Sequence, residues 1–326
     1  MENQKSKLLI FVLAFSFLFG LTVHAFGANY PDKPITLIIP YGPGGSTDLT
    51  TRALASAAKQ YLGQPVVCEN KAGATGTVGA AYVISKPPDG YTIGLIATSP
   101  LINYYFRGTE PFNPITDVTY IIRWGGYQMG LMVRSDAPWK SLKDLVEYAE
   151  KNPGKVSYGT SGVGSYSHLT VEELGLLTKS SWVHIPCKGD NEAAISLLGG
   201  HLEAISGPIQ SPLIEAGKLR LLTTYGSVRS GQFPQTPTLQ EIGYKIVSDP
   251  YVGIMGPKGM PQKIVSVIHD AFKKAMDDPG FQSAMEKFGM PLLYLSSEDY
   301  AKYVQQDSVR IVNLLKRLNL LAKPEK

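Results

Sequence analysis

Strand-length apolar runs alternate with helix-period segments along most of this chain. Strands are predicted at 35–40, 66–69, 91–98, 156–161, 182–187, 202–206 and 219–225. Helices are predicted at 46–62, 77–85, 166–178, 192–198, 263–277 and 296–318, with a further helix that begins at the capping box of residues 141–144. Because strand–helix–strand units favour parallel pairing, the pattern predicts parallel sheets. The predicted fold class is α/β, with one architecture built twice.

The size and composition of the chain are typical of a globular protein with two domains. Its 326 residues exceed the size at which a single core usually splits. Hydrophobic residues make up 44% and charged residues 18%, which excludes intrinsic disorder and a polytopic membrane protein. The formal net charge is +4 without any run of Lys or Arg, so nothing indicates a nucleic-acid partner.

Residues 1–25 are predicted to form a cleavable signal peptide. Lys5 and Lys7 precede an apolar run at 8–21, and small residues, Val23 and Ala25, stand at the −3 and −1 positions of the cleavage site. The run is shorter than the roughly 20 residues that span a bilayer. We therefore expect export to the periplasm of a Gram-negative bacterium, with an uncleaved N-terminal anchor as the alternative.

Two extended stretches, 120–134 and 245–257, are predicted to join the two halves as a pair of crossover strands. The helices after residue 257 would then return to the first half. We expect lobe 1 to comprise residues 26–124 plus 252–326, and lobe 2 to comprise residues 125–251. Two lobes joined in this way leave a central cleft, where hinge closure around a small ligand can occur.

The loops that follow strand carboxyl ends are the expected ligand-binding segments. The first loop, 40–48, carries three glycines whose N–H groups can approach an anion, but it lacks the Lys of a P-loop. Its candidate binding residues are Tyr41, Gly44, Gly45, Thr47 and Asp48. For Asp48 the alternative is a first-turn carboxylate that stabilises its own helix.

Three further loops complete the predicted site, and most of their candidates are small or hydroxyl-bearing. Hydroxyl groups can donate hydrogen bonds to a carboxylate without a buried cation. The candidates are Thr98 and Ser99 in the second loop, Thr160, Ser161, Gly164, Ser165 and His168 in the third, and Gly189 and Asp190 in the fourth.

Enzymatic and cofactor sites find little support in the sequence. Ser165 lacks the GxSxG context of a nucleophile elbow, and His168 is expected to be structural rather than a base. A periplasmic esterase stays open only as a third function class. The five His are isolated, neither CxxC nor HExxH occurs, and no dinucleotide motif is present, so no metal or cofactor is expected. Cys68 and Cys187 are expected to be free thiols in different lobes.

The spaced motifs of the mature chain, taken together, resemble the Bug family, the extracytoplasmic solute receptors of tripartite tricarboxylate transporters, also called the TctC family. The resemblance covers essentially the whole mature chain. It rests on YPDKPI at 30–35, PYGPGGSTD at 40–48, ENKAGA at 69–74, PDGY at 88–91, GxGS at 162–165 followed by HL at 168–169, PxKG at 186–189, LGG at 198–200, AGKL at 216–219 and PxxPT at 234–238.

The resemblance implies a two-lobed periplasmic binding protein of the type II-like kind. It implies capture of a small organic acid, often a dicarboxylate, and delivery to the large and small inner-membrane subunits of a transporter, without catalysis. The first-loop and third-loop candidates match the binding loops of the family. A periplasmic sensor that presents its ligand to a signalling receptor is the alternative.

Two positions depart from the family pattern near the expected cleft. Cys187 stands where an aromatic residue is usual, and Gly207 lies within a segment where an acidic or aromatic residue is common. The loss of an aromatic wall would leave space for a different acid.

Overall fold

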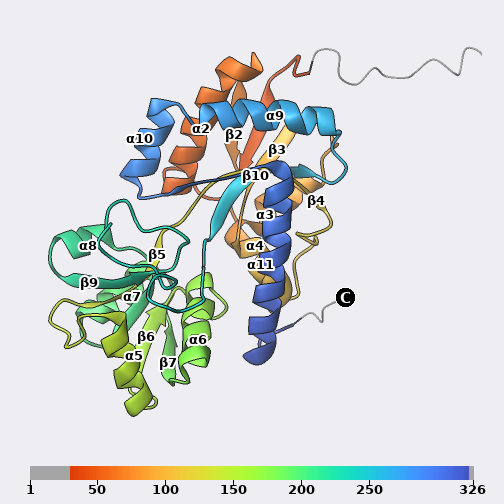
Figure 1. The fold of residues 1–326 in the computed structure, drawn as a ribbon. Helices are drawn as coiled ribbons and strands as arrows, with labels where there is room; N and C mark the ends of the chain where they lie inside the picture. Colours follow the sequence, from red (N-terminus) through yellow and green to blue (C-terminus); the bar gives the residue numbers. More distant parts are fainter. Residues whose placement is uncertain (1–29, 323–326) are drawn as a thin grey trace, which may run out of the picture.

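The chain forms two lobes, each built on one β-sheet with helices on both faces (Figure 1). The computed structural model describes residues 30–322. The predicted signal peptide lies outside the described residues. None of the helices in residues 30–322 is long and apolar enough to cross a membrane.

Lobe 1 is the part of the molecule built on a six-stranded sheet with the order β11-β4-β10-β3-β1-β2. Its N-terminal elements are β1 (Ile35–Ile39), α2 (Ser46–Leu62), β2 (Val66–Asn70), the short helix η1 (Ala74–Gly76), α3 (Thr77–Ile84), β3 (Thr92–Ala97), α4 (Ser99–Phe106) and β4 (Val118–Gly126). Its C-terminal elements are β10 (Tyr251–Pro257), α9 (Gln262–Ala275), α10 (Pro279–Lys287), β11 (Leu292–Leu295) and α11 (Ser297–Arg317).

Lobe 2 is continuous in sequence and is built on a five-stranded sheet with the order β7-β6-β8-β5-β9. Its elements are β5 (Met129–Arg134), α5 (Leu142–Lys151), β6 (Val156–Thr160), α6 (Tyr166–Thr178), β7 (Trp182–Pro186), α7 (Asp190–Leu198), β8 (Ala204–Pro208), α8 (Ser211–Glu215) and β9 (Leu219–Thr224). The predicted α/β fold with two lobes is therefore confirmed. The lobe boundaries at 124/125 and 251/252 stay a proposal.

Each sheet contains an antiparallel strand that the chain contributes as it arrives from the other lobe. β10 enters lobe 1 and pairs antiparallel with β3 and β4, while β5 enters lobe 2 and pairs antiparallel with β8 and β9. The parallel pairing predicted for the strand–helix–strand units is confirmed for β1, β2 and β3 and for β6, β7 and β8. The antiparallel strands β5 and β10 lie within the two stretches predicted as crossover strands. The order β2-β1-β3-β10-β4 in lobe 1 matches β7-β6-β8-β5-β9 in lobe 2.

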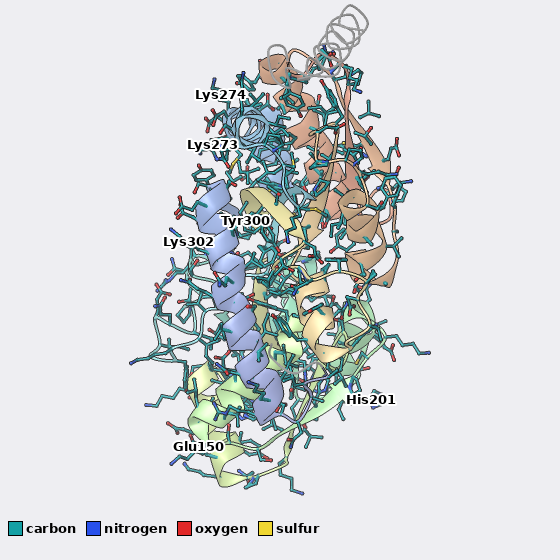
Figure 2. The ribbon with its side chains drawn as sticks, turned by 90° about the vertical axis from the view of Figure 1, so that its right-hand side faces the viewer. Glu150, His201, Lys273, Lys274, Tyr300 and Lys302 are labelled. Atoms are coloured by element: carbon teal, nitrogen blue, oxygen red, sulfur yellow. The ribbon has the colours of Figure 1, made fainter. Side chains whose placement is uncertain are left out.

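Alternate side chains of the central strands pack into different cores. On β1, Leu37 lies in the cluster under α2 and α9, whereas Ile38 lies in the cluster under α3 and α11. This period of two fills both faces of a buried sheet. Helix α11 runs beside lobe 1 with Tyr300 fully buried and Lys302 exposed (Figure 2).

Besides the short helix η1, three elements of lobe 1 were absent from the sequence prediction. Helix α4 begins at Ser99, where a loop was expected, and α10 and β11 lie in a segment for which no element was predicted. Helix α10 carries a recognisable start signal, since Asp278 caps the N–H of Phe281 and Pro279 occupies the first helical position. Helix α4 is only eight residues long, and this length leaves little room for an amphipathic period to appear.

Gly253, at the centre of β10, makes the closest backbone approach to α11. A Cβ at this position would meet the Tyr300 ring and lie 2.6 Å from the Ile122 carbonyl oxygen. Gly253→Ala is therefore expected to lower the free energy of unfolding by about 1–3 kcal/mol through overpacking. Urea denaturation measures this change. Gly231→Ala, whose Cβ would meet open space, is the control, and an equal effect of both substitutions would contradict the packing argument.

Candidate functional site

A cavity of about 470 Å³ lies between the lobes, at the ends of the strands. In lobe 1 the strand order reverses between β1 and β3, and in lobe 2 it reverses between β6 and β8. Ligands of open α/β sheets bind in the crevice at such a point, beyond the strand carboxyl ends. Here both crevices open into the same cavity.

The lobe 1 wall is rich in hydrogen-bond donors. Tyr41 follows β1, while Thr98 and Ser99 follow β3, and all three line the cavity. Helix α4 begins at Ser99 without a side-chain cap. Pro100 has no N–H and the Leu101 N–H donates to the Thr98 carbonyl (3.1 Å), so the Ser99 N–H is the first-turn donor left for an acceptor. Asn103 and Arg107 extend the wall along α4. The Thr98 hydroxyl oxygen accepts a hydrogen bond from the Tyr251 N–H (2.8 Å), which ties this wall to β10.

The lobe 2 wall is formed by the loop between β6 and α6. Ser161, Gly164 and Ser165 line the cavity. Gly164 adopts a φ of +75° and lies so close to α4 that a Cβ would be 2.6 Å from the Phe106 ring. The Ser165 hydroxyl oxygen caps α6 by accepting a hydrogen bond from the His168 N–H (3.2 Å). The loop is thus tightly wound and touches the opposite lobe.

Two histidines support this loop from behind. His168 Nδ1 accepts a hydrogen bond from the Gly164 N–H (3.2 Å), and His184 Nε2 lies 2.7 Å from the Thr160 hydroxyl. The two rings are 4.0 Å apart between centroids. Burial lowers the pKa of each ring to about 4, and the neighbouring His184 contributes to the shift at His168. Both rings are therefore neutral at pH 7, and they hold the loop in place.

In the first loop, Asp48 has a structural role. Its carboxylate accepts hydrogen bonds from the Gly44 N–H (2.9 Å), the Asn70 amide (2.8 Å) and Arg52 Nε (2.9 Å). Burial of the carboxyl opposes ionisation, but these hydrogen bonds and the Arg52 charge keep the pKa of Asp48 below its ordinary value. The alternative reading, a carboxylate that stabilises its own helix, therefore describes Asp48 better than contact with a ligand.

The predicted site residues divide into three groups. Six of them line the cavity: Tyr41, Thr98, Ser99, Ser161, Gly164 and Ser165. Thr47, Asp48, Thr160 and His168 are buried supports, and the Thr47 hydroxyl is 2.6 Å from that of the cavity residue Tyr127. Gly44 and Gly45 are exposed outside the cavity wall, whereas Gly189 and Asp190 lie at the start of α7, and Asp190 packs over Gly207.

The cavity residues missed by the sequence prediction include Asn103, Arg107, Tyr127 and Lys188. Lys188 belongs to the motif at 186–189, so a cation at the cleft was visible in the sequence. Asn103 and Arg107 lie on or directly after the unpredicted helix α4.

Cys187 and Cys68 are both unpaired, and Cys187 is absent from the cavity lining of the described residues.

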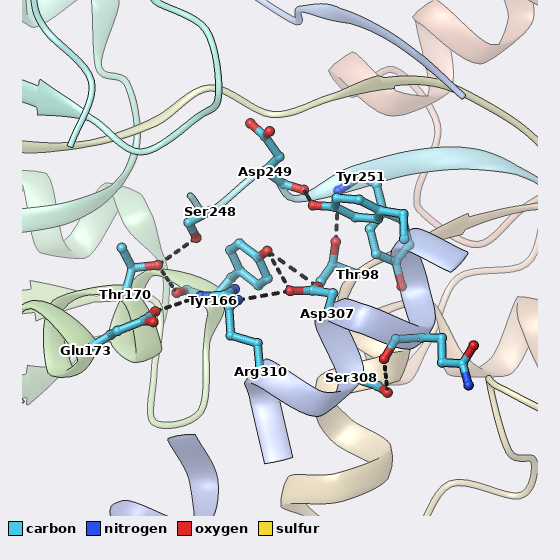
Figure 3. Close-up of polar contacts among 12 residues, drawn as sticks. Thr98, Tyr166, Thr170, Glu173, Ser248, Asp249, Tyr251, Asp307, Ser308 and Arg310 are labelled. Carbon is cyan, nitrogen blue, oxygen red and sulfur yellow. Dashed lines mark hydrogen bonds and ion pairs between the residues drawn. The ribbon is translucent and has the colours of Figure 1, made fainter. Parts of the chain in front are cut away.

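A buried polar network joins the lobes next to the cavity (Figure 3). Arg310 of α11 donates to Glu173 of α6 (2.7 Å) and to Asp307 on its own helix (3.1 Å). The hydroxyl of Tyr166, which lines the cavity, lies 3.4 Å from Asp307. Burial raises the pKa of Asp307, while the Arg310 charge opposes that shift. This network anchors the start of α6 to lobe 1.

The described residues offer no metal centre. Within residues 30–322, no three His, Cys, Asp or Glu side chains are grouped so that they could hold a metal ion.

The histidine pair predicts a pH-dependent stability. The unfolded state binds protons at pH values near 6.5 and the folded state only near 4, so the free energy of unfolding should fall as the pH decreases through this window. Urea denaturation at pH 7, 6 and 5 measures the slope. His184→Gln should reduce the slope, whereas His201→Gln, at an exposed position, should not. Equal slopes in both variants would contradict the assignment.

The contact between Gly164 and Phe106 can be tested with a matched pair in one loop. Gly164 and Gly162 both have positive φ, but a Cβ would meet Phe106 only at Gly164 and open space at Gly162. Gly164→Ala is expected to cost about 1–3 kcal/mol more unfolding free energy than Gly162→Ala. Equal losses in urea denaturation would show that backbone strain alone matters at these positions.

The comparisons with known proteins agree with this architecture. A family model described as the tripartite tricarboxylate transporter family receptor, TctC, matches residues 50–320. The UPF0065 protein in the gbd 5′ region of Cupriavidus necator is 41% identical over 304 residues, which cover 93% of each chain. Protein BugT of Bordetella pertussis is 32% identical over 289 residues, covering 87% of this chain and 89% of BugT.

Solved structures show the same likeness. A TctC solute binding protein from Polaromonas, solved without ligand, gives a TM-score of 0.80 at 31% identity and covers 88% of this chain and 99% of its own. A protein of R. palustris solved with adipate gives 0.72 at 26% identity and covers 88% and 97%. By family model, sequence identity and fold, this chain belongs to the TctC, or Bug, family of solute-binding receptors.

Proposed function

We propose that the chain is a periplasmic receptor that captures a small organic carboxylate between its lobes and delivers it to a tripartite tricarboxylate-type transporter. The observation that carries this proposal is the lining of the cavity. Hydroxyl groups and an uncapped helix N-terminus meet there with Arg107 from lobe 1 and Lys188 from lobe 2. Each of these groups favours an anion.

The two cations are well suited to a ligand that bridges the lobes. Neither Arg107 nor Lys188 forms an ion pair with another residue of the segment 30–322. A carboxylate that enters the cavity would provide the negative partner that Arg107 in lobe 1 and Lys188 in lobe 2 both lack. Since only a closed cleft brings both cations to one ligand, binding would favour closure. The related protein solved with adipate supports a dicarboxylate as one candidate ligand.

A receptor without catalysis fits the site better than an esterase. The Ser165 hydroxyl is occupied as a helix cap for the His168 N–H. His168 Nδ1 already accepts from the Gly164 N–H, so that nitrogen is not available to take a proton from Ser165. No charge relay of the triad type is therefore built into this loop.

The proposal is tested by native mass spectrometry of protein purified from the periplasm, followed by thermal shift with a broad carboxylate panel. A ligand at a hundredfold excess over Kd should stabilise the fold by about 2.7 kcal/mol. Arg107→Met and Lys188→Met should each weaken binding by about tenfold, equivalent to about 1.4 kcal/mol, whereas Lys258→Met, beyond the cavity lining, should not. If no carboxylate co-purified or raised the Tm, the proposal would fail.

Delivery needs a separate measurement. Uptake of the identified carboxylate should require both this receptor and the two membrane subunits of the transporter. Uptake that persists in cells lacking the membrane subunits would favour the alternative role of a ligand-presenting sensor.

A further inference from the structure

Asp190 lies directly behind the lobe 2 wall of the cavity, next to the lining residue Ser161. It is the first residue of α7, and a Cβ built on Gly207 would lie only 3.0 Å from its Oδ1 atom. Gly207 belongs to β8, next to the cavity residue Pro208. The absence of a side chain at Gly207 therefore makes the room in which the Asp190 carboxyl group sits, at the point where β6 and β8 diverge.

The Asp190 carboxyl group lacks a full set of partners. Its Oδ1 atom is buried and accepts no hydrogen bond from any residue of the described chain. Burial raises the pKa of Asp190, and a hydrogen bond from the cavity residue Ser161 partly offsets the shift. A buried acceptor without a donor costs about 1–3 kcal/mol, and more when it is charged. A donor supplied by a ligand would remove that cost.

The two crevices that face each other across the cavity differ in polarity. The lobe 1 crevice presents the hydroxyls of Tyr41 and Ser99 and the Ser99 N–H at the start of α4, which suit a carboxylate. In lobe 2, the carboxyl of Asp190 lies behind the lining residue Ser161, just outside the cavity lining. None of the described residues in the cavity lining is acidic, so Asp190 brings a negative group to a site otherwise suited to anions.

We infer that Asp190 selects carboxylates that also carry a hydrogen-bond donor, an ammonium or a hydroxyl group, and that this donor pairs with Asp190 while the carboxylate binds to lobe 1. The inference deepens the proposed function and rests on it. The terminal torsion of an Asp side chain is broad and two-fold, so the carboxyl can turn either oxygen toward Ser161 and the cavity. Lys188, two residues earlier, can hold a second carboxylate of the same ligand.

The selectivity arises because a ligand without a donor leaves the Asp190 carboxyl group unpaired, whereas a ligand with a donor does not. A ligand with an ammonium group forms a charge-assisted hydrogen bond with Asp190, which is about twice as strong as a neutral one. A ligand of the same size without a donor closes the cleft over an unpaired carboxyl group. Sites built to pair with a polar group reject analogues that lack it more strongly than they reject a missing methylene.

The test uses matched ligands on the intact protein, purified from the periplasm and freed of ligand by reversible unfolding. Calorimetry compares propionate with lactate and alanine, succinate with malate and aspartate, glutarate with glutamate, and adipate with 2-aminoadipate. We expect the best-bound series to show at least tenfold tighter binding of a donor-bearing member. Equal or tighter binding of the donor-free member would overturn the inference while leaving the carboxylate receptor intact.

Asp190→Asn keeps the size of the side chain and removes its charge. It should weaken binding of an ammonium-bearing ligand at least tenfold and leave its donor-free partner unchanged or tighter. Asp136→Asn, an exposed position in the same lobe, is the matched control and should change neither. An unaltered preference in a folded Asp190→Asn protein would overturn the inference. If no carboxylate of the panel bound to the wild-type protein, the proposed function and the inference would both fail.

Discussion

The exchange of strands between the lobes is the constraint on which the rest of the molecule depends. β10 is hydrogen-bonded between β3 and β4, and β5 between β8 and β9, so each sheet is held together by a strand that arrives from the other lobe. The connections that lead into these strands pass beside the cavity, where Tyr127 and Pro250 form part of its lining. The Tyr127 N–H donates to the Pro250 carbonyl (3.0 Å), so the two connections are also bonded to each other. The cavity wall and the connections between the lobes thus share the same backbone.

The buried network around Arg310 adds a second connection between the lobes. Burial of an ion pair is costly unless its geometry is good, and loss of one partner leaves an uncompensated charge. Here the guanidinium bonds to both Glu173 and Asp307, and Tyr166 extends the network to the cavity wall. A change in the cleft at Tyr166 therefore reaches α11 through direct contacts. The network thus links α6 to α11 through direct side-chain contacts.

Elements whose start and end signals lie in their own sequence could be predicted, whereas contacts between segments far apart in the sequence could not. The predicted helices at 46–62 and 166–178 match α2 and α6, because Gly63 ends the first in a left-handed conformation and Ser165 caps the second. The antiparallel pairing of β10 could not be predicted, because the residues of a strand do not determine which other strands it pairs with. Asp48 could be read in two ways, and only the fold brings Asn70, 22 positions away, to its carboxylate. Arg107 was missed together with the helix that carries it, whereas Lys188 was present in a recognised motif.

The central position of β10 also affects the order in which the sheets of the two lobes can form during synthesis of the chain. Lobe 2 is one uninterrupted segment and has all of its strands once residue 224 is present. In lobe 1, β4 connects to β3, β1 and β2 only through β10, because β10 lies between β3 and β4. A chain that emerges N-terminus first thus has a complete set of lobe 2 strands while the sheet of lobe 1 is still in two pieces. The cavity, which needs both walls, cannot be completed before Pro250 is present, and α9, α10, β11 and α11 are added to lobe 1 after it.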